Sequence, residues 1–261
     1  MSGAPTLCAA TDAVIRRFGI ATPRDVRDTA GSYRLRGTGA EGRTSMAAPT
    51  VLQTLTAAQA GIEVAAMAAF AASGIVAAVR KRLDPVGVVV VAWLAAFGGG
   101  TLRDLLLDRR PFFWVAQGWQ VWAVLVLCMA ALAVMRARHL RPTERAMQWP
   151  DALGLGLFAA NGTQLAILAG MAPLNAVVMG VITACFGGVL RDIVCNEIPA
   201  TLRDHRPYAV CAFAGGWVVI GVGHAGFAPD IALIAGAATA SALRAAALVF
   251  DWRLPGWRAD G

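Results

Sequence analysis

The stretch FGGGTLRD at residues 97–104 is the key to this sequence. Three consecutive glycines stand inside an apolar run, and Arg103 and Asp104 follow almost at once. A soluble helix avoids such glycines, because each lowers helix propensity by about 1 kcal/mol relative to alanine. A lipid-facing helix avoids the charges. The rest of the chain must therefore account for both features.

The composition is that of a membrane protein. Hydrophobic residues make up 57% of the 261 residues and charged residues only 15%, and the mean hydropathy is +0.60. Soluble domains contain about 45–50% apolar and about 25% charged residues. A bilayer core of about 30 Å needs about 20 helical residues. Apolar stretches of about that length lie near 61–79, 86–107, 112–135, 152–170, 174–195, 208–225 and 229–250.

The chain repeats itself at a spacing of 88 residues. Residues 63–111 align with 151–199 without a gap, and 15 of the 49 positions are identical. FAASG at 70–74 matches FAANG at 158–162, and GGTLRD at 99–104 matches GGVLRD at 187–192. Matching Gly, Pro, Arg and Asp cannot be explained by shared hydrophobicity. The sequence therefore predicts a duplicated unit of three helices and one additional helix.

An odd number of helices in the unit decides its orientation. The second copy must enter the membrane from the opposite side, so the copies are expected to be inverted repeats. The predicted fold is an all-α integral membrane protein with seven transmembrane helices, two inverted three-helix repeats plus a seventh helix. Its expected parts are a disordered N-terminal tail (1–57), the first repeat (58–140), the second repeat (141–226) and a last helix with a short tail (227–261).

The glycines allow two interpretations. Gly98, Gly99 and Gly100 lie deep in the second helix of the first copy, and Gly187 and Gly188 lie equally deep in that of the second. Such glycines favour a kink or break, whose freed carbonyls must be buried in protein or line a wet cavity. Gly-interrupted helices at matching positions of inverted repeats indicate a transport pathway. Alternatively, the glycines only permit close helix packing.

Arg103, Asp104, Arg191 and Asp192 are candidate pathway or bracing residues. Adjacent residues point about 100° apart on a helix, so neither arginine is expected simply to face its own aspartate. We expect the charges to pair with polar groups of neighbouring helices, at opposite ends of the pathway. The alternative is that the arginines extend to the membrane surface. Ser73 and Asn161, which are repeat-equivalent, are candidate polar residues of the pathway.

The net charge of +7 could suggest a nucleic-acid partner, but most basic residues stand at the ends of apolar segments. One face of the predicted bundle collects Arg80, Lys81, Arg82, Arg136, Arg138, Arg141, Arg145, Arg203, Arg206, Arg253 and Arg258. The opposite loops hold only Arg109 and Arg110. The positive-inside rule places the basic face in the cytoplasm and the N-terminus outside, although residues 1–45 contain seven arginines. No nucleic-acid partner is expected.

FGGGTLRDLLLDRRPFFW, GLFAANG and ITACFGGVLRDIVCNEIP resemble the prokaryotic branch of the trimeric intracellular cation channel family, also catalogued as a glycine-transporter domain. The resemblance covers about residues 58–252. It implies a homotrimer in the cell's inner membrane, surrounded by lipid. Each protomer is expected to hold a pore, lined by the kinked second and fifth helices and permeable to monovalent cations, chiefly potassium.

A secondary transporter of a small solute such as glycine is the alternative function. The same broken helices would then form a closed binding site. The sequence holds no HExxH, GxSxG or P-loop pattern, so no enzymatic activity is predicted. We expect no cofactor and no metal site.

Overall fold

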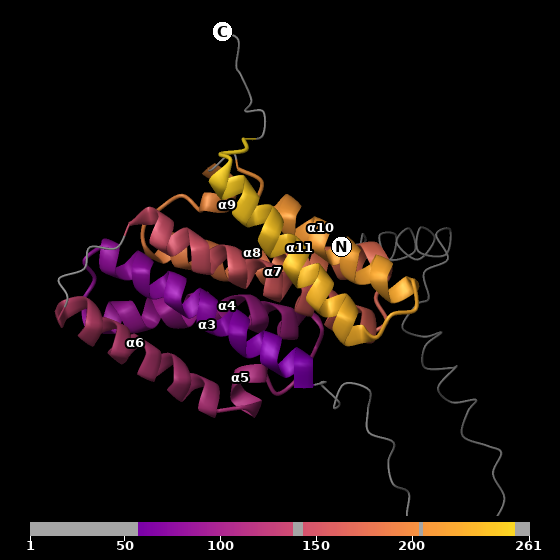
Figure 1. Cartoon of the computed structure of the whole chain (residues 1–261). Helices are drawn as coiled ribbons and strands as arrows, with labels where there is room; N and C mark the ends of the chain where they lie inside the picture. Colours follow the sequence, from indigo (N-terminus) through magenta and orange to yellow (C-terminus); the bar gives the residue numbers. More distant parts are fainter. Residues whose placement is uncertain (1–56, 138–142, 204–205, 254–261) are drawn as a thin grey trace, which may run out of the picture. The chain divides into compact units, whose positions relative to one another are not determined.

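The structure, a computed structural model, describes residues 57–137, 143–203 and 206–253 (Figure 1). These residues form helices and no strand. The predicted N-terminal tail lies outside them except for Ala57, the first residue of α3. In chain order the helices are α3 (Ala57–Arg80), α4 (Pro85–Leu106), α5 (Phe113–Ala116), α6 (Trp119–Ala137), α7 (Glu144–Leu168), α8 (Pro173–Val194), α9 (Ala200–Arg203), α10 (Ala209–His224) and α11 (Pro229–Val249).

Four of the described helices, α3, α4, α8 and α11, are long and apolar enough to cross a membrane. The apolar helices α6 and α10 are shorter by the same measure. The predicted all-helical architecture with several apolar spans is therefore confirmed. The count of seven spans remains a prediction.

The starts of α4 and α8 follow from local chemistry. Pro85 and Pro173 occupy the first turns, where proline's missing N–H costs nothing. The carboxylate of Asp84 also accepts a hydrogen bond from the Gly87 amide at 2.7 Å, which caps α4. The sequence placed these starts near Val86 and Leu174, one residue further along the chain.

The duplication is visible in the backbone. Arg82 and Gly170 have φ angles of 56° and 80°, and Asp108 and Asn196 have φ angles of 50° and 55°. Both pairs are separated by the repeat spacing of 88 residues. The left-handed region is unfavourable for most residues, and Gly, Asn and Asp tolerate it best. The two copies thus leave their first and second helices by the same turns.

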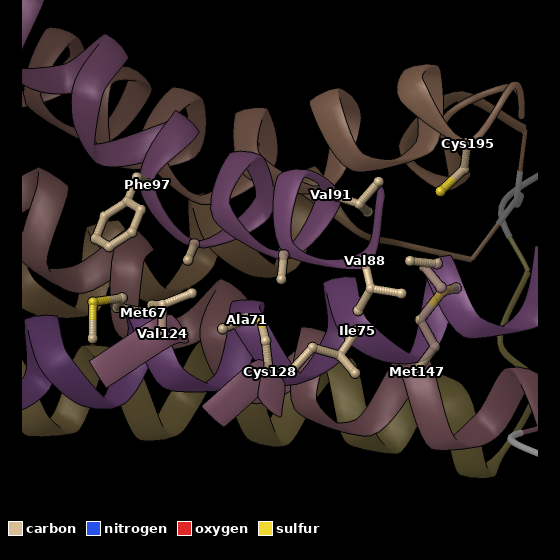
Figure 2. Close-up of a cluster of buried hydrophobic side chains, with 14 of the residues drawn as sticks. Met67, Ala71, Ile75, Val88, Val91, Phe97, Val124, Cys128, Met147 and Cys195 are labelled. Carbon is tan, nitrogen blue, oxygen red and sulfur yellow. The ribbon is translucent and has the colours of Figure 1, made fainter. Parts of the chain in front are cut away.

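The packing places α3 and α7 at the centre of the described helices. Helix α3 packs against α4 and α7, α7 packs against α8 and α11, and α4 packs against α8. Helix α6 lies along the outside of α3 (Figure 1). One buried cluster joins α3, α4 and α6, including Met67 and Ile75 of α3, Val88 and Phe97 of α4, and Cys128 of α6 (Figure 2).

Helices α4 and α8 meet backbone to backbone at matching glycines. A Cβ atom on Gly99 would lie 2.1 Å from the Thr183 carbonyl oxygen, and one on Gly187 would lie 2.4 Å from the Ala95 oxygen. Gly99 and Gly187 are repeat-equivalent, and so are Ala95 and Thr183. Since residue numbers rise along α4 as they fall along α8, the two helices run antiparallel at this crossing.

The structure does not show the predicted break. Helices α4 and α8 each continue as a single α-helix through their glycines. Close packing is what the glycines provide here, because a side chain on Gly99 or Gly187 would collide with the facing backbone. Helix propensity is a local quantity, and the contact with the opposing helix outweighs its cost.

The crossing makes a stability prediction. Gly99→Ala should lower the free energy of unfolding by about 1–3 kcal/mol, the usual cost of forcing extra atoms into a packed core. Gly61→Ala is the matched control in α3, because nothing lies within 4 Å of its added Cβ. Unfolding in mixed detergent micelles measures both variants. Equal stability of Gly99→Ala and wild type would contradict the close contact.

Candidate functional site

A buried arginine lies on each side of the α4–α8 crossing. Arg103 follows Gly99 by four residues, and Arg191 follows Gly187 by four. Four residues correspond to about 6 Å of helix. Because the helices are antiparallel, the two arginines lie on opposite sides of the crossing. They are 0% and 2% exposed, respectively, so neither extends to the surface as the alternative interpretation supposed.

The Arg103 cluster comprises Glu63, Arg103, Asp104 and Asn161. Arg103 Nη2 lies 2.8 Å from Glu63 Oε1 of α3 and 2.7 Å from Asp104 Oδ1. The other oxygen of Asp104 accepts the Phe113 amide of α5 at 2.9 Å. The guanidinium carbon of Arg103 also lies 5.4 Å from the centre of the Phe113 ring. The cluster therefore joins α3, α4 and α5.

The Arg191 cluster comprises Ser73, Asp151, Arg191 and Asp192. Arg191 Nη1 lies 2.6 Å from Asp151 Oδ1 of α7, and Arg191 Nε lies 2.8 Å from Asp192 Oδ1. The other oxygen of Asp192 accepts the Ala200 amide of α9 at 2.8 Å. Each arginine thus has one carboxylate from its own helix and one from a neighbouring helix.

The pairing with polar groups of neighbouring helices was expected, but the expectation about the adjacent aspartates was wrong. Arg103 Nε and Nη2 both donate to Asp104 Oδ1, at 2.9 and 2.7 Å. The long arginine side chain bends across the helix surface, and the Phe113 amide of α5 holds the Asp104 carboxylate in reach. The angle of about 100° between adjacent residues on the helix therefore does not keep an arginine side chain from reaching the aspartate next to it.

Glu63 and Asp151 are the site residues that the sequence interpretation missed. Each precedes its arginine by 40 residues, and the two are repeat-equivalent. This spacing was the available signal. Both residues lie next to the starts of the predicted apolar stretches, where charged residues commonly face solvent, whereas the observed helices begin about two turns before these residues.

Ser73 and Asn161 lie at the clusters, each at the cluster of the other repeat. Ser73 Oγ accepts a hydrogen bond from Arg191 Nη1. Asn161 Nδ2 donates to Glu63 Oε1 at 3.4 Å. Each repeat therefore contributes one polar side chain to the arginine cluster of the other repeat.

The remaining candidate glycines do not all face the crossing. A Cβ on Gly98 would meet Leu190 of α8 at 2.6 Å, whereas one on Gly100 would meet the Phe113 ring at 2.5 Å. One on Gly188 would lie 3.3 Å from the Tyr208 hydroxyl. Gly100 thus leaves space for the Phe113 ring, which covers Arg103, and Gly188 leaves space for the Tyr208 hydroxyl.

The Arg191 cluster opens into a cavity of about 320 Å³. Five arginines and four acidic residues line this cavity, together with Met147, Gln148, Ile198 and Ala200. The arginines are Arg80, Arg191, Arg206, Arg244 and Arg253, and the acids are Glu144, Asp151, Asp192 and Glu197. The wall therefore presents both signs of charge with a small basic excess.

Asp251 reduces the basic excess at the rim. Its Oδ1 accepts from Arg206 Nε at 2.8 Å, and its Oδ2 accepts from Arg253 Nε at 3.1 Å. The hydrogen bonds from Arg206 and then from Arg253 lower the pKa of the Asp251 carboxyl. Asp251 consequently stays ionised at neutral pH and offsets part of the charge of these two arginines.

No group of three or more His, Cys, Asp or Glu side chains is placed to hold a metal ion within residues 57–137, 143–203 and 206–253. The charged side chains form arginine–carboxylate contacts instead. The arrangement is suited to binding or excluding charged solutes and to holding helices together.

Comparison with known proteins identifies the class. The family model described as Glycine transporter matches residues 60–137 and 148–224. A UPF0126 membrane protein of Vibrio cholerae is 34% identical over 198 residues, which cover 74% of this chain and 80% of that protein. The UPF0126 inner membrane protein YadS of Escherichia coli is 34% identical over 200 residues, which cover 76% and 96%. The chain is therefore a membrane protein of the UPF0126 family.

A solved structure refines this assignment. The TRIC trimeric intracellular cation channel orthologue from Rhodobacter sphaeroides is 35% identical and superposes with a TM-score of 0.69, over 76% of this chain and 100% of that one. The chain belongs to the TRIC family, as its motifs indicated. The descriptions of these three relatives name membrane proteins and a channel, and none names an enzyme.

The buried clusters make a second prediction. Arg191→Met should lower the free energy of unfolding by about 3–5 kcal/mol, because it leaves two buried carboxylates without their cation. Lys81→Ala is the control, since it breaks a half-exposed pair with Glu197 at 2.7 Å, worth about 0–1 kcal/mol. Detergent unfolding measures both. Similar losses for the two variants would show that the Arg191 cluster is not a structural constraint.

Proposed function

We propose that the protein is a cation-permeable channel of the inner membrane, conducting chiefly potassium. It assembles as a homotrimer with a pore through each protomer, lined by α4 and α8. The observation that carries this proposal is the antiparallel glycine crossing with a buried arginine cluster on each side. Membership of the TRIC family supports it, as does the relative described as a trimeric intracellular cation channel.

Permeation requires α4 and α8 to part. The contacts at Gly99 and Gly187 leave no room for an ion between the two backbones. If the helices separate and also unwind at Gly98–Gly100 and Gly187–Gly188, the freed main-chain oxygens can replace part of an ion's hydration shell. Arg103 with Asp104 and Arg191 with Asp192 then hold or gate the opening from its two sides.

The proposed topology has seven spans. Two inverted repeats at 58–140 and 141–226 are followed by a seventh helix within 227–261, after a tail at 1–57. The two separate segments matched by the family model support this division. The antiparallel crossing of equivalent helices supports the inversion.

The proposed orientation places the C-terminus in the cytoplasm and the N-terminus outside, following the positive-inside rule. Green fluorescent protein fused after Gly261 should fluoresce, and alkaline phosphatase fused there should be inactive. Fusions at Asp108, between α4 and α5, should give the opposite pair of results. Active phosphatase after Gly261 would reverse the topology and place the cavity outside.

One observation favours the alternative function, transport of a small zwitterion such as glycine. The cavity beside Arg191 presents arginines and carboxylates together. A zwitterion needs a partner of each sign, whereas a potassium ion is repelled by the arginines. This cavity could therefore serve as a binding site rather than as the mouth of a pore.

The two functions are separated by measuring the purified protein in planar bilayers under a potassium chloride gradient and in liposomes with labelled glycine. A channel gives discrete unitary currents that reverse near the potassium equilibrium potential. Glycine uptake should not exceed that of empty liposomes.

Saturable glycine uptake without unitary currents would overturn the channel and favour the transporter. A reversal potential near that of chloride would overturn cation selectivity alone. Cross-linking of the protein in membranes should stop at the trimer.

A further inference from the structure

We propose that Ser73 and Asn161 are positioning residues that couple the two arginine clusters, so that the two sides of the α4–α8 crossing loosen together. The effect on channel opening rests on the proposed channel function. The coupling of the two clusters rests only on contacts between the two repeats.

Each of these residues contacts the ion pair of the other repeat. Ser73 accepts from Arg191 Nη1, the same nitrogen that donates to Asp151. Asn161 donates to Glu63 Oε1, the same oxygen that accepts from Arg103. Ser73 is 0% exposed and Asn161 is 1% exposed, so water does not replace these contacts easily.

Gly74, the residue after Ser73, packs the same turn of α3 directly against α4. A Cβ on Gly74 would lie 2.8 Å from Ala92 Cα of α4. Through Gly74 the turn contacts α4, and through Ser73 it contacts Arg191 of α8. If α4 and α8 separate, α3 cannot follow both, and one of the two contacts must break.

The equivalent turn of α7 is arranged in the same way. A Cβ on Gly162 would lie 2.7 Å from Thr183 Oγ1 of α8. Asn161 contacts Glu63 of α3, which binds Arg103 of α4. The crossing therefore lies between two bridges: the Ser73 bridge, in which Ser73 of α3 bonds Arg191, and the Asn161 bridge, in which Asn161 of α7 bonds Glu63. Loss of either bridge removes a constraint on both α4 and α8.

The two bridges are unequal in strength. The Asn161–Glu63 contact is long, at 3.4 Å. Asn161 Oδ1 and Arg103 Nη1 are buried and have no hydrogen-bond partner among the described residues. Ser73 accepts directly from the Arg191 guanidinium, which also holds Asp151 and Asp192 at 2.6 and 2.8 Å. The Ser73 bridge therefore carries more of the constraint.

Hydrogen–deuterium exchange tests the coupling directly. Ser73→Ala should increase exchange in residues 183–192, next to its own contact, and also in residues 95–104 on the other side of the crossing. Ser241→Ala is the matched control, because it removes a serine hydroxyl of α11 that bonds the Leu153 carbonyl at 3.4 Å rather than a side chain of either cluster. Faster exchange confined to 183–192 would overturn the coupling.

Unitary recordings test the gating consequence. Ser73→Ala should raise the ratio of open to closed time about tenfold, as expected for one lost hydrogen bond to a charged group. Asn161→Ala should raise it by a smaller factor. The unitary conductance should not change in either variant, since both bonds hold the closed arrangement.

The outcomes separate this inference from the proposed function. If the wild-type protein passes no current, the channel fails, and exchange alone decides the coupling. If the wild type conducts and both variants leave open time unchanged, the inference fails and the channel stands. A larger effect of Asn161→Ala than of Ser73→Ala would overturn the conclusion that the Ser73 bridge carries more of the constraint.

Discussion

The structure depends on satisfying a buried arginine charge in each repeat. An unpaired charge in a low-dielectric interior costs several kcal/mol even after relaxation, and the hydrocarbon core of a bilayer offers no hydrogen-bond acceptor. Arg103 and Arg191 meet this demand with one carboxylate from their own helix and one from a neighbour. The neighbouring carboxylates, Glu63 and Asp151, fix how α3 faces α4 and how α7 faces α8. The helices are therefore aligned by charge as well as by apolar packing.

The glycine crossing and the clusters depend on each other. Backbone contact at Gly99 and Gly187 brings α4 and α8 close enough for α3 and α7 to touch both of them. The clusters in turn prevent rotation that would replace these glycines by larger residues at the contact. This explains why the two features stand four residues apart in both copies. Neither feature alone would specify the crossing.

Sequence reasoning indicated the class of fold and most residues of the two arginine clusters because both depend on local patterns. Apolar lengths indicated membrane helices, and the 88-residue spacing indicated which residues correspond. The sequence could not predict that α4 stays helical through Gly98–Gly100. The low helix propensity of glycine can be read locally, but the contact with the α8 backbone that outweighs it depends on the tertiary structure. Glu63 and Asp151 were missed for a related reason. Their position near a helix start suggested solvent, and only their distance from Arg103 and Arg191 in space reveals their role.

The two sides of the crossing have diverged where the copies differ. At equivalent positions the second copy has Phe186 where the first has Gly98, Thr183 where the first has Ala95, and Asn161 where the first has Ser73. The Arg191 cluster opens into a cavity with charged walls, whereas the ring of Phe113 covers Arg103. A membrane presents different solutions to its two faces, so a symmetric pathway would meet unequal conditions at its ends. Duplication supplied two equivalent charge clusters, and their surroundings differ, because one opens into a cavity with charged walls and the other lies under the Phe113 ring.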